Sequence, residues 1–189
     1  MRRPLLSLPL LLALATPAIG PAVAQDSPAA PPPPCATDQH DDFDFWIGTW
    51  DVTQNGQPAG HNHIQRIDQG CALMESWTSA TSNFTGHSLN FFDPQSGQWN
   101  QLWLDSSGTV LRLAGGLQTA PGGDAGSTVQ AMVLEGETPG ADGSPVRNRI
   151  TWTPAADGSV RQHWETSTDG KQWTTAFDGQ YVRAENAEE

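Results

Sequence analysis

The sequence predicts an all-β protein built as a single antiparallel up-and-down barrel of about ten strands. The main observation is a series of short segments, rich in β-branched and aromatic residues, that follow one another at intervals of roughly ten residues. Turn dipeptides such as Asn55-Gly56, Asp157-Gly158 and Asp169-Gly170 separate the segments and suit tight hairpins. Helical periodicity is almost absent. Consecutive strands joined by hairpins close most simply into a barrel.

The N-terminal segment, residues 1–24, has the pattern of a secretory signal peptide. A basic start, Met1 to Arg3, precedes an apolar run from Leu5 to Ala18, and the small residues Ala22 to Ala24 suit a signal peptidase. We expect cleavage before Gln25. The apolar run is shorter than the ~20 residues of a membrane-spanning helix. The sequence therefore predicts a periplasmic or secreted protein with no membrane insertion after signal cleavage.

Residues 25–39 are rich in Pro and Ala, and Pro31 to Pro34 are consecutive prolines. Such a segment adopts an extended polyproline-like conformation and has too few apolar side chains to build a core. We therefore expect a disordered linker over 25–39 and a β-barrel domain over 40–185, a size typical of one domain.

The chain is acidic. Its formal net charge of −12 becomes −14 when residues 1–24 are removed, because that segment contains Arg2 and Arg3 and no acid. A surface of this charge repels nucleic acid and anionic membranes. We therefore expect no nucleic-acid partner, and the charge is explained well enough as a solubilising surface.

Cys35 and Cys71 are the only cysteines in the sequence. The oxidising surroundings of an exported chain favour a disulfide between them, which would tie the N-terminal arm to the third strand. Lipidation of Cys35 is disfavoured because prolines precede it. A catalytic thiol is disfavoured because the sequence implies no activating base nearby.

The first predicted strand runs through Phe43 to Val52. The strand period of two places Phe43, Phe45 and Ile47 on one face and Trp46, Gly48 and Trp50 on the other, so we expect burial on both sides. Gly48 weakens a strand, and a bend or the close approach of another backbone explains it best.

The remaining strands follow in order, and two looser connections rich in Gly and Pro, 118–127 and 136–145, are expected to be mobile loops at one mouth of the barrel. Asp157, Asp169 and Asp178 are predicted to lie in hairpin turns, where Asp favours the backbone geometry. The predicted strands are 59–68, 71–78, 84–92, 98–105, 109–117, 128–135, 146–153, 159–166 and 173–183.

A polar residue followed two places later by Trp occurs in three of these strands. The strand period puts both side chains of each pair on one face. If that face points inward, the lumen has indole walls with a few polar groups, the usual composition of a small-molecule site. An outward face covered by neighbours would give the same pattern, and Trp99, Trp152 and Trp173 are interpreted mainly as packing residues. The pairs are Glu75 with Trp77, Gln101 with Trp103, and Gln162 with Trp164.

Metal sites are weaker hypotheses. His61 and His63 share a strand face and could join His87 in a three-nitrogen site, but solvated strand residues explain them as well, and no metal is predicted. Four acids lie around the start of the first strand and could hold a cation, although capping of a helix start or turn explains them more simply. These acids are Asp38, Asp41, Asp42 and Asp44.

Several longer motifs stand out along the chain: Phe43 to Val52, Gly70 to Trp77, Gly86 to Asn90, Trp99 to Asp105, Arg149 to Thr153 and Val160 to Glu165. Together they resemble an exported bacterial family of unknown function among the lipocalin-like barrels of the calycin superfamily. This resemblance implies a lipocalin or fatty-acid-binding-protein-like barrel whose closed end combines Gly48, Trp50 and a basic residue from the last strand, here Arg183. It transfers no catalytic residue.

A more distant likeness, through Trp46 to Trp50, is to haem-binding nitrobindin-type barrels. Those proteins carry the haem-ligating His near the C-terminus, whereas here no His follows His163. Haem is therefore not expected, and no cofactor is predicted.

Three functions remain open. The first is an exported binding protein that holds a small, partly apolar ligand in the lumen, with the Trp rings stacking on the ligand and the polar groups orienting it. The second is an enzyme on the same barrel with Glu75 as general acid or base, its pKa raised by burial. The third is a structural or interaction module of the cell envelope, for which no protein partner is indicated. An enzyme is the less favoured of the first two, since no Ser-His-Asp order, phosphate loop or dinucleotide fingerprint occurs.

Overall fold

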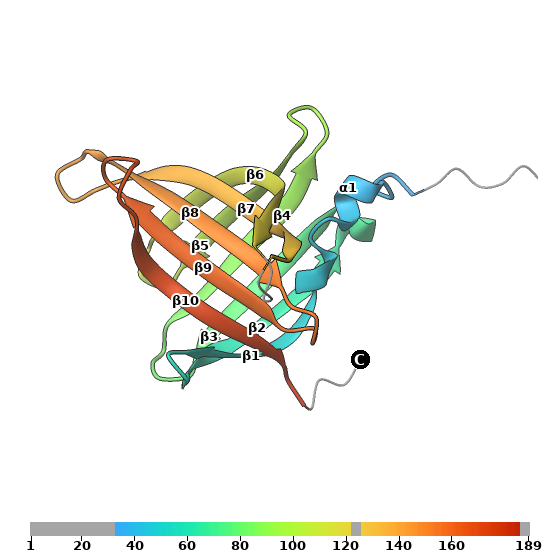
Figure 1. Cartoon of the computed structure of the whole chain (residues 1–189), viewed down its shortest axis with the longest axis horizontal. Coiled ribbons are helices and arrows are strands. Elements are labelled where there is room, and N and C mark those ends of the chain that lie inside the picture. Colours follow the sequence, from blue (N-terminus) through green and yellow to red (C-terminus); the bar gives the residue numbers. More distant parts are fainter. Residues whose placement is uncertain (1–32, 122–125, 186–189) are drawn as a thin grey trace, which may run out of the picture. The chain divides into compact units, whose positions relative to one another are not determined.

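The chain from Pro33 onward forms one closed antiparallel barrel, confirming the predicted fold class (Figure 1). The computed structural model describes residues 33–121 and 126–185. The predicted signal peptide and most of the predicted linker lie outside these residues. Among the described residues, no helix has the length and apolar character needed to cross a membrane.

Ten strands follow one another around the barrel, and each pairs with its neighbours in sequence. The ring closes where β1 pairs with β10, with Trp50 opposite Arg183 and Val52 opposite Tyr181. The strands are β1 (Gly48–Gln54), β2 (Gln57–Ile67), β3 (Ala72–Ser79), β4 (Thr85–Asp93), β5 (Gln98–Asp105), β6 (Val110–Pro121), β7 (Thr128–Pro139), β8 (Pro145–Pro154), β9 (Val160–Ser167) and β10 (Thr174–Arg183).

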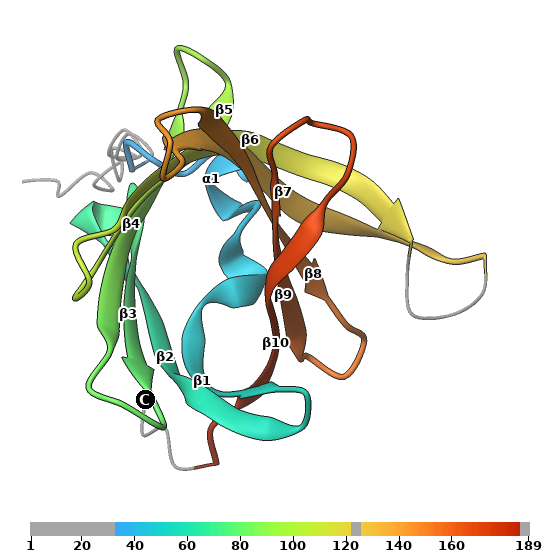
Figure 2. The ribbon, with the colours of Figure 1, turned by 90° about the vertical axis from the view of Figure 1, so that its left-hand side faces the viewer.

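One end of the barrel is closed by the segment before β1, which lies across the ring in Figure 2. This segment contains α1 (Asp38–Asp41) and the 3-10 helix η1 (Asp44–Trp46). Phe43 and Trp46 are fully buried and stack with their ring centroids 4.9 Å apart. Phe43 also meets Trp99 and Trp152 edge-on, at 5.6 and 5.1 Å. These rings form the apolar core of the closed end.

The prediction that the first strand includes Phe43 to Ile47 is wrong, because β1 begins at Gly48. Phe43 and Trp46 are three residues apart, which is one turn of a 3-10 helix, so both rings reach the core without alternating along a strand. α1 also begins within the range expected for the linker.

Gly48 lies where the chain enters the barrel, and Arg183 occupies the space that a side chain would need there. A Cβ atom on Gly48 would lie 1.8 Å from an Arg183 guanidinium nitrogen, and Gly48 has a φ of 141°. Arg183 Cζ is 4.0 Å from the centroid of the Trp50 ring, and its Nη1 donates a hydrogen bond to the Ile47 carbonyl at 2.6 Å. The glycine thus permits the guanidinium to cover the indole.

A disulfide joins Cys35 to Cys71, confirming the expected pairing. Cys71 follows the 3-10 helix η2 (Asp68–Gly70) and immediately precedes β3. Arg66, at the end of β2, bonds Asp41 and Asp44 in the closing segment. The disulfide and the ion pairs both hold the closing segment at the end of the barrel where β2 ends and β3 begins.

Two loop predictions differ from the structure. Strands β6 and β7 pair from Ala114 opposite Glu135 to Pro121 opposite Thr128, so the first Gly-rich connection is mostly strand. Strand β7 likewise continues to Pro139. The two connections flank β7 and lie at opposite ends of the barrel, since successive hairpins of an up-and-down barrel alternate ends. Asp178 lies inside β10, not in a turn, because it pairs with Arg161 across the sheet.

Candidate functional site

The half of the lumen away from the closing segment contains a cavity of about 210 Å³. All six residues of the polar-x-Trp pairs line it, so the structure brings together side chains from β3, β5 and β9. The other residues that line the cavity are Phe84, Asp105, Leu111, Ile150, Ala176, Phe177 and Tyr181. That these residues bind a ligand remains a prediction.

The cavity has a polar floor and aromatic walls because the three paired strands run in the same direction. In an up-and-down barrel the odd-numbered strands are parallel to each other, and β3, β5 and β9 all run toward the end opposite the closing segment. In each pair the polar residue comes first and therefore lies deeper, while the Trp lies nearer the mouth. Strand β10 runs the opposite way and presents Phe177 near the mouth before Tyr181 in the floor.

Glycines on neighbouring strands make room for two of these rings. A Cβ atom on Gly60 of β2 would lie 2.5 Å from the Trp77 indole, and one on Gly86 of β4 would overlap the Trp103 indole. The rings can therefore lie flat against the adjacent backbone. This packing leaves the centre of the lumen free.

The floor is built around Glu75, which is 4% exposed and lies opposite Ser88 on β4. Ser88 donates a 2.5 Å hydrogen bond to Glu75 Oε2, and the Asn62 amide donates a 2.7 Å bond to Oε1. Burial raises the pKa of Glu75 to about 7, although these two hydrogen bonds oppose the shift. The group therefore changes charge near neutral pH.

Other polar side chains extend the floor. Asn90 donates to Ser88 Oγ at 2.8 Å, and the Gln101 amide donates to Asn90 Oδ1 at 2.9 Å. On the other side of the lumen, the Tyr181 hydroxyl donates to Gln162 Oε1. Burial, and then the nearby charge of Glu75, raise the pKa of Tyr181. The Asn62 amide also donates to the Tyr181 hydroxyl at 3.4 Å, so these groups form one connected hydrogen-bond network.

The aromatic rings of the walls are also held by polar and ring contacts. The Trp103 indole N–H donates to Asp105 at 3.1 Å, and that of Trp164 donates to Asn148 Oδ1 at 3.0 Å. Trp77 meets Phe177 edge-on, with centroids 6.0 Å apart. Each of these contacts holds a ring in a defined orientation.

Sequence reasoning missed the floor residues on β2, β4 and β10. Asn62, Ser88, Asn90 and Tyr181 are buried polar side chains at alternate strand positions, and that pattern of inward polar residues was the available signal. Which residues lie opposite each other in the floor depends on the strand register. The pairing of Glu75 with Ser88 could therefore not be predicted from the sequence of either strand alone.

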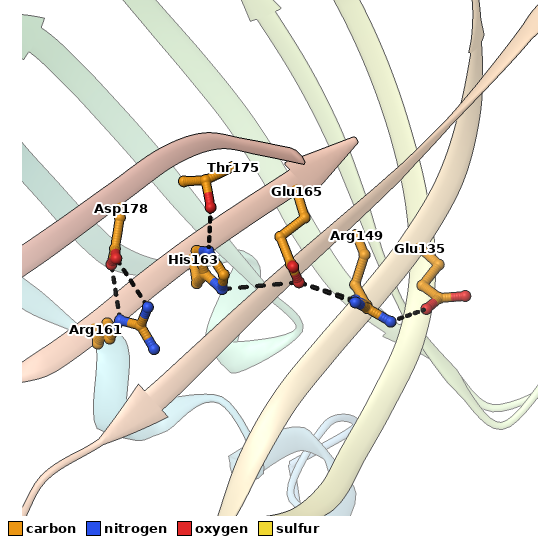
Figure 3. Close-up of polar contacts among 7 residues, drawn as sticks. All are labelled: Glu135, Arg149, Arg161, His163, Glu165, Thr175 and Asp178. Atoms are coloured by element: carbon orange, nitrogen blue, oxygen red, sulfur yellow. Dashed lines mark hydrogen bonds and ion pairs between the residues drawn. The ribbon is translucent and has the colours of Figure 1, made fainter. Parts of the chain in front are cut away.

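Figure 3 shows polar side chains on the outer face of β7, β8, β9 and β10. Arg161, His163 and Glu165 of β9 alternate with the cavity residues Gln162 and Trp164, so they lie on the outside of the barrel. Arg161 pairs with Asp178 on β10 at 2.7 Å. Glu165 accepts a hydrogen bond from Arg149 on β8 at 3.0 Å, and Arg149 approaches Glu135 on β7. Gln162 and Trp164, the polar-x-Trp pair of β9, therefore lie on the inner face of the barrel.

Metal and haem hypotheses gain no support from the side-chain arrangement. Among the described residues, no three His, Cys, Asp or Glu side chains are placed to hold a metal ion. His61 is on the outer surface and bonds Asp51 at 2.7 Å. Two of the four acids near the first strand, Asp41 and Asp44, are held by Arg66.

No family model matches the chain, and a search of curated proteins found no match. The site must therefore be interpreted from its own geometry.

Proposed function

We propose that this protein is an exported binding protein that holds a small, partly apolar ligand in the barrel lumen. The observation that carries the proposal is the arrangement of the cavity: aromatic rings around the mouth and a connected set of polar groups at the floor. A concave site with mostly apolar walls and a few convergent polar groups is the usual form of a small-molecule site. The ligand's apolar part would lie between Trp77, Trp103 and Trp164, and its polar end would reach the floor.

The size of the cavity limits the ligand. A cavity of roughly 150 Å³ in a protein core can hold benzene. At about 210 Å³, this cavity suits a molecule with one aromatic ring or a similar apolar body and a short polar arm. A fatty acid or a haem is too large to lie wholly inside it.

We also propose that the chain belongs with the exported lipocalin-like barrels. Its support is the ten-stranded up-and-down closure together with Gly48, Trp50 and Arg183 at the closed end. The disulfide between Cys35 and Cys71 fits an oxidising compartment such as the periplasm or the extracellular space.

An enzyme on the same barrel is the second candidate function. Glu75 favours it, because a carboxyl group with a pKa of about 7 can both give and take a proton near neutral pH. Against it, Glu75 is already hydrogen-bonded by Ser88 and Asn62, which suits a group that orients a ligand. Turnover of a bound ligand, lost in Glu75→Gln while binding persists, would favour the enzyme.

The binding proposal is tested by screening a metabolite panel for quenching of tryptophan fluorescence. We expect a ligand that fits the cavity to quench the emission of the protein, and the Trp77→Ala and Trp164→Ala variants to bind it at least about tenfold more weakly. Trp173→Ala is the matched control. Trp173 stacks on Arg149 of the outer network and does not line the cavity, so this variant should bind normally.

Two results would contradict the proposal. One is a panel in which no compound changes the emission or the melting temperature. The other is a ligand that loses affinity in Trp173→Ala and keeps it in Trp77→Ala, since that ligand would bind the outer surface.

A further inference from the structure

The charged groups around the lumen are all acidic. Of the nine Lys and Arg residues, Arg2 and Arg3 precede the described part of the chain, and none of the other seven lines the cavity. Arg149 on β8 and Arg161 on β9 point outward and pair with acids of the outer network, as Figure 3 shows. Two carboxyl groups line the cavity, Glu75 in the floor and Asp105 near the mouth. No cation from the barrel wall balances Glu75.

Asp105 stays ionised at neutral pH. Partial burial works against this, but hydrogen bonds from Ser107, Trp103 and Thr109 outweigh it and lower the pKa of Asp105. The mouth therefore carries a fixed negative charge.

The floor also presents hydrogen-bond acceptors to the lumen. Glu75 lines the cavity, whereas Asn62, whose Oδ1 has no hydrogen-bond partner in the described part of the protein, does not line it. Gln101 uses its amide nitrogen on Asn90 and Ser88, so its Oε1 is a further acceptor. Because buried acceptors without donors are costly, such a floor is best complemented by a ligand that brings N–H groups.

The aromatic walls also favour a positively charged ligand. The faces of aromatic rings are electronegative and attract a cation within about 6 Å of the ring centroid. Trp77, Trp103, Trp164 and Phe177 surround the space above the floor. A cavity with aromatic walls and a carboxylate at its base is complementary to a compact organic cation.

We propose that the ligand is a protonated amine with a small apolar body, whose ammonium group binds at Glu75 and whose apolar body lies among the tryptophans. This proposal rests on the proposed function and adds the chemical class of the ligand. The ammonium N–H groups donate to Glu75 and Gln101, and the rings exclude water from the pair. Neutral and anionic compounds of the same shape bind more weakly, because they leave the floor acceptors unsatisfied or repel the two acids.

Binding of an amine should depend on pH through Glu75. The groups that face Glu75 from neighbouring strands are Asn62 and Ser88, which do not titrate, and Tyr181, whose raised pKa keeps it neutral. The amine itself stays protonated well above neutral pH, as Lys does. Below a pH of about 7, Glu75 must first lose its proton, so affinity should fall about tenfold for each further unit of acidity.

The test compares three probes that share a phenyl ring and a two-carbon chain: phenethylammonium, phenylethanol and phenylacetate. Binding to the purified protein is measured by calorimetry and by tryptophan fluorescence at pH 8. We expect phenethylammonium to bind at least about tenfold more tightly than phenylethanol, and phenylacetate to bind least. In the Glu75→Gln variant the preference for the ammonium over the alcohol should fall about tenfold, because only the aromatic walls and Asp105 then favour the cation.

The Asp157→Asn variant is the control for net charge, because Asp157 lies in the exposed β8–β9 turn far from the cavity. It should keep the full preference. Equal binding of the ammonium and the alcohol, or an unchanged preference in Glu75→Gln, overturns the proposal. Failure of all three probes at millimolar concentration also overturns it, whereas the proposed function fails only if the wider metabolite panel leaves the protein unchanged as well.

Discussion

Gly86 lies directly under the indole of Trp103, so closely that a Cβ atom on Gly86 would be 2.1 Å from Cζ2 of the ring. The position of one cavity wall therefore depends on the absence of a side chain on the adjacent strand. We expect Gly86→Ala to push the Trp103 ring from its place, to destabilise the protein by about 1–3 kcal/mol and to weaken ligand binding. Urea unfolding and fluorescence titration measure the two effects.

Gly116→Ala on β6 is the matched control, since a Cβ atom there meets open space. It should change stability by less than about 0.5 kcal/mol and leave binding unchanged. If Gly86→Ala behaves like Gly116→Ala, the Trp103 ring is not confined by the backbone of β4.

Glu75 should make the barrel more stable in mild acid than at neutral pH. Its pKa rises from 4.5 to about 7 on burial, so the folded state binds a proton between these values and the unfolded state does not. The stabilisation is complete below pH 4.5 and is lost as pH rises through about 7. The shift corresponds to about 3 kcal/mol.

The measurement is urea unfolding of the wild type and of Glu75→Gln across this pH range. Because the exposed aspartates are common to both proteins, the difference between the two curves isolates Glu75. It should change by about 3 kcal/mol between acid and neutral pH. Parallel curves would mean that the Glu75 carboxyl group is solvated in the folded protein.

The barrel and the grouping of the polar-x-Trp residues followed from short-range patterns. The period of two in a strand is fixed by backbone geometry, so Glu75 and Trp77 had to share a face whatever the fold. Hairpin dipeptides between the segments then favoured sequential antiparallel pairing. The pairing of Cys35 with Cys71 followed from the cysteine count and the expected oxidising compartment.

The remaining features depend on contacts that a pattern does not encode. Phe43 and Trp46 fit an alternating strand as well as a 3-10 turn, and only packing against Trp99 and Trp152 decides between them. Asp is common in turns, but Asp178 lies within β10, where its carboxylate accepts a hydrogen bond from Arg161 on the adjacent strand. Asn62 could be assigned to the floor only after the strand register that places it opposite Trp77 was known.

The closed end should depend on the planar guanidinium of Arg183. Its stack on Trp50 and its hydrogen bond to the Ile47 carbonyl join the last strand to the start of the first. We expect Arg183→Lys to lose about 1–2 kcal/mol of stability, because an ammonium group keeps the charge but not the stacked plane. Urea unfolding measures this, with the exposed Arg112→Lys as control. Equal effects of the two substitutions would show that only charge matters at Arg183.

Removal of the disulfide should lower stability without emptying the cavity. Cys35 and Cys71 are 36 residues apart, and closing a loop of that length stabilises by about 3–4 kcal/mol on the chain-entropy model. The Cys35→Ala, Cys71→Ala double variant should unfold at correspondingly lower urea, while ligand affinity stays within about twofold, because neither cysteine lines the cavity. A loss of binding in a folded double variant would mean that the closing segment shapes the lumen.

The most direct test of the account is native mass spectrometry of the protein purified from its own cells or their medium, followed by denaturation and identification of any released molecule. The account predicts one small organic passenger per barrel, lost in Trp77→Ala and retained in Trp173→Ala. A protein that has no passenger and stays empty across a metabolite panel would contradict the claim that the lumen is a binding site. The outer surface of the barrel would then be the place to seek its function.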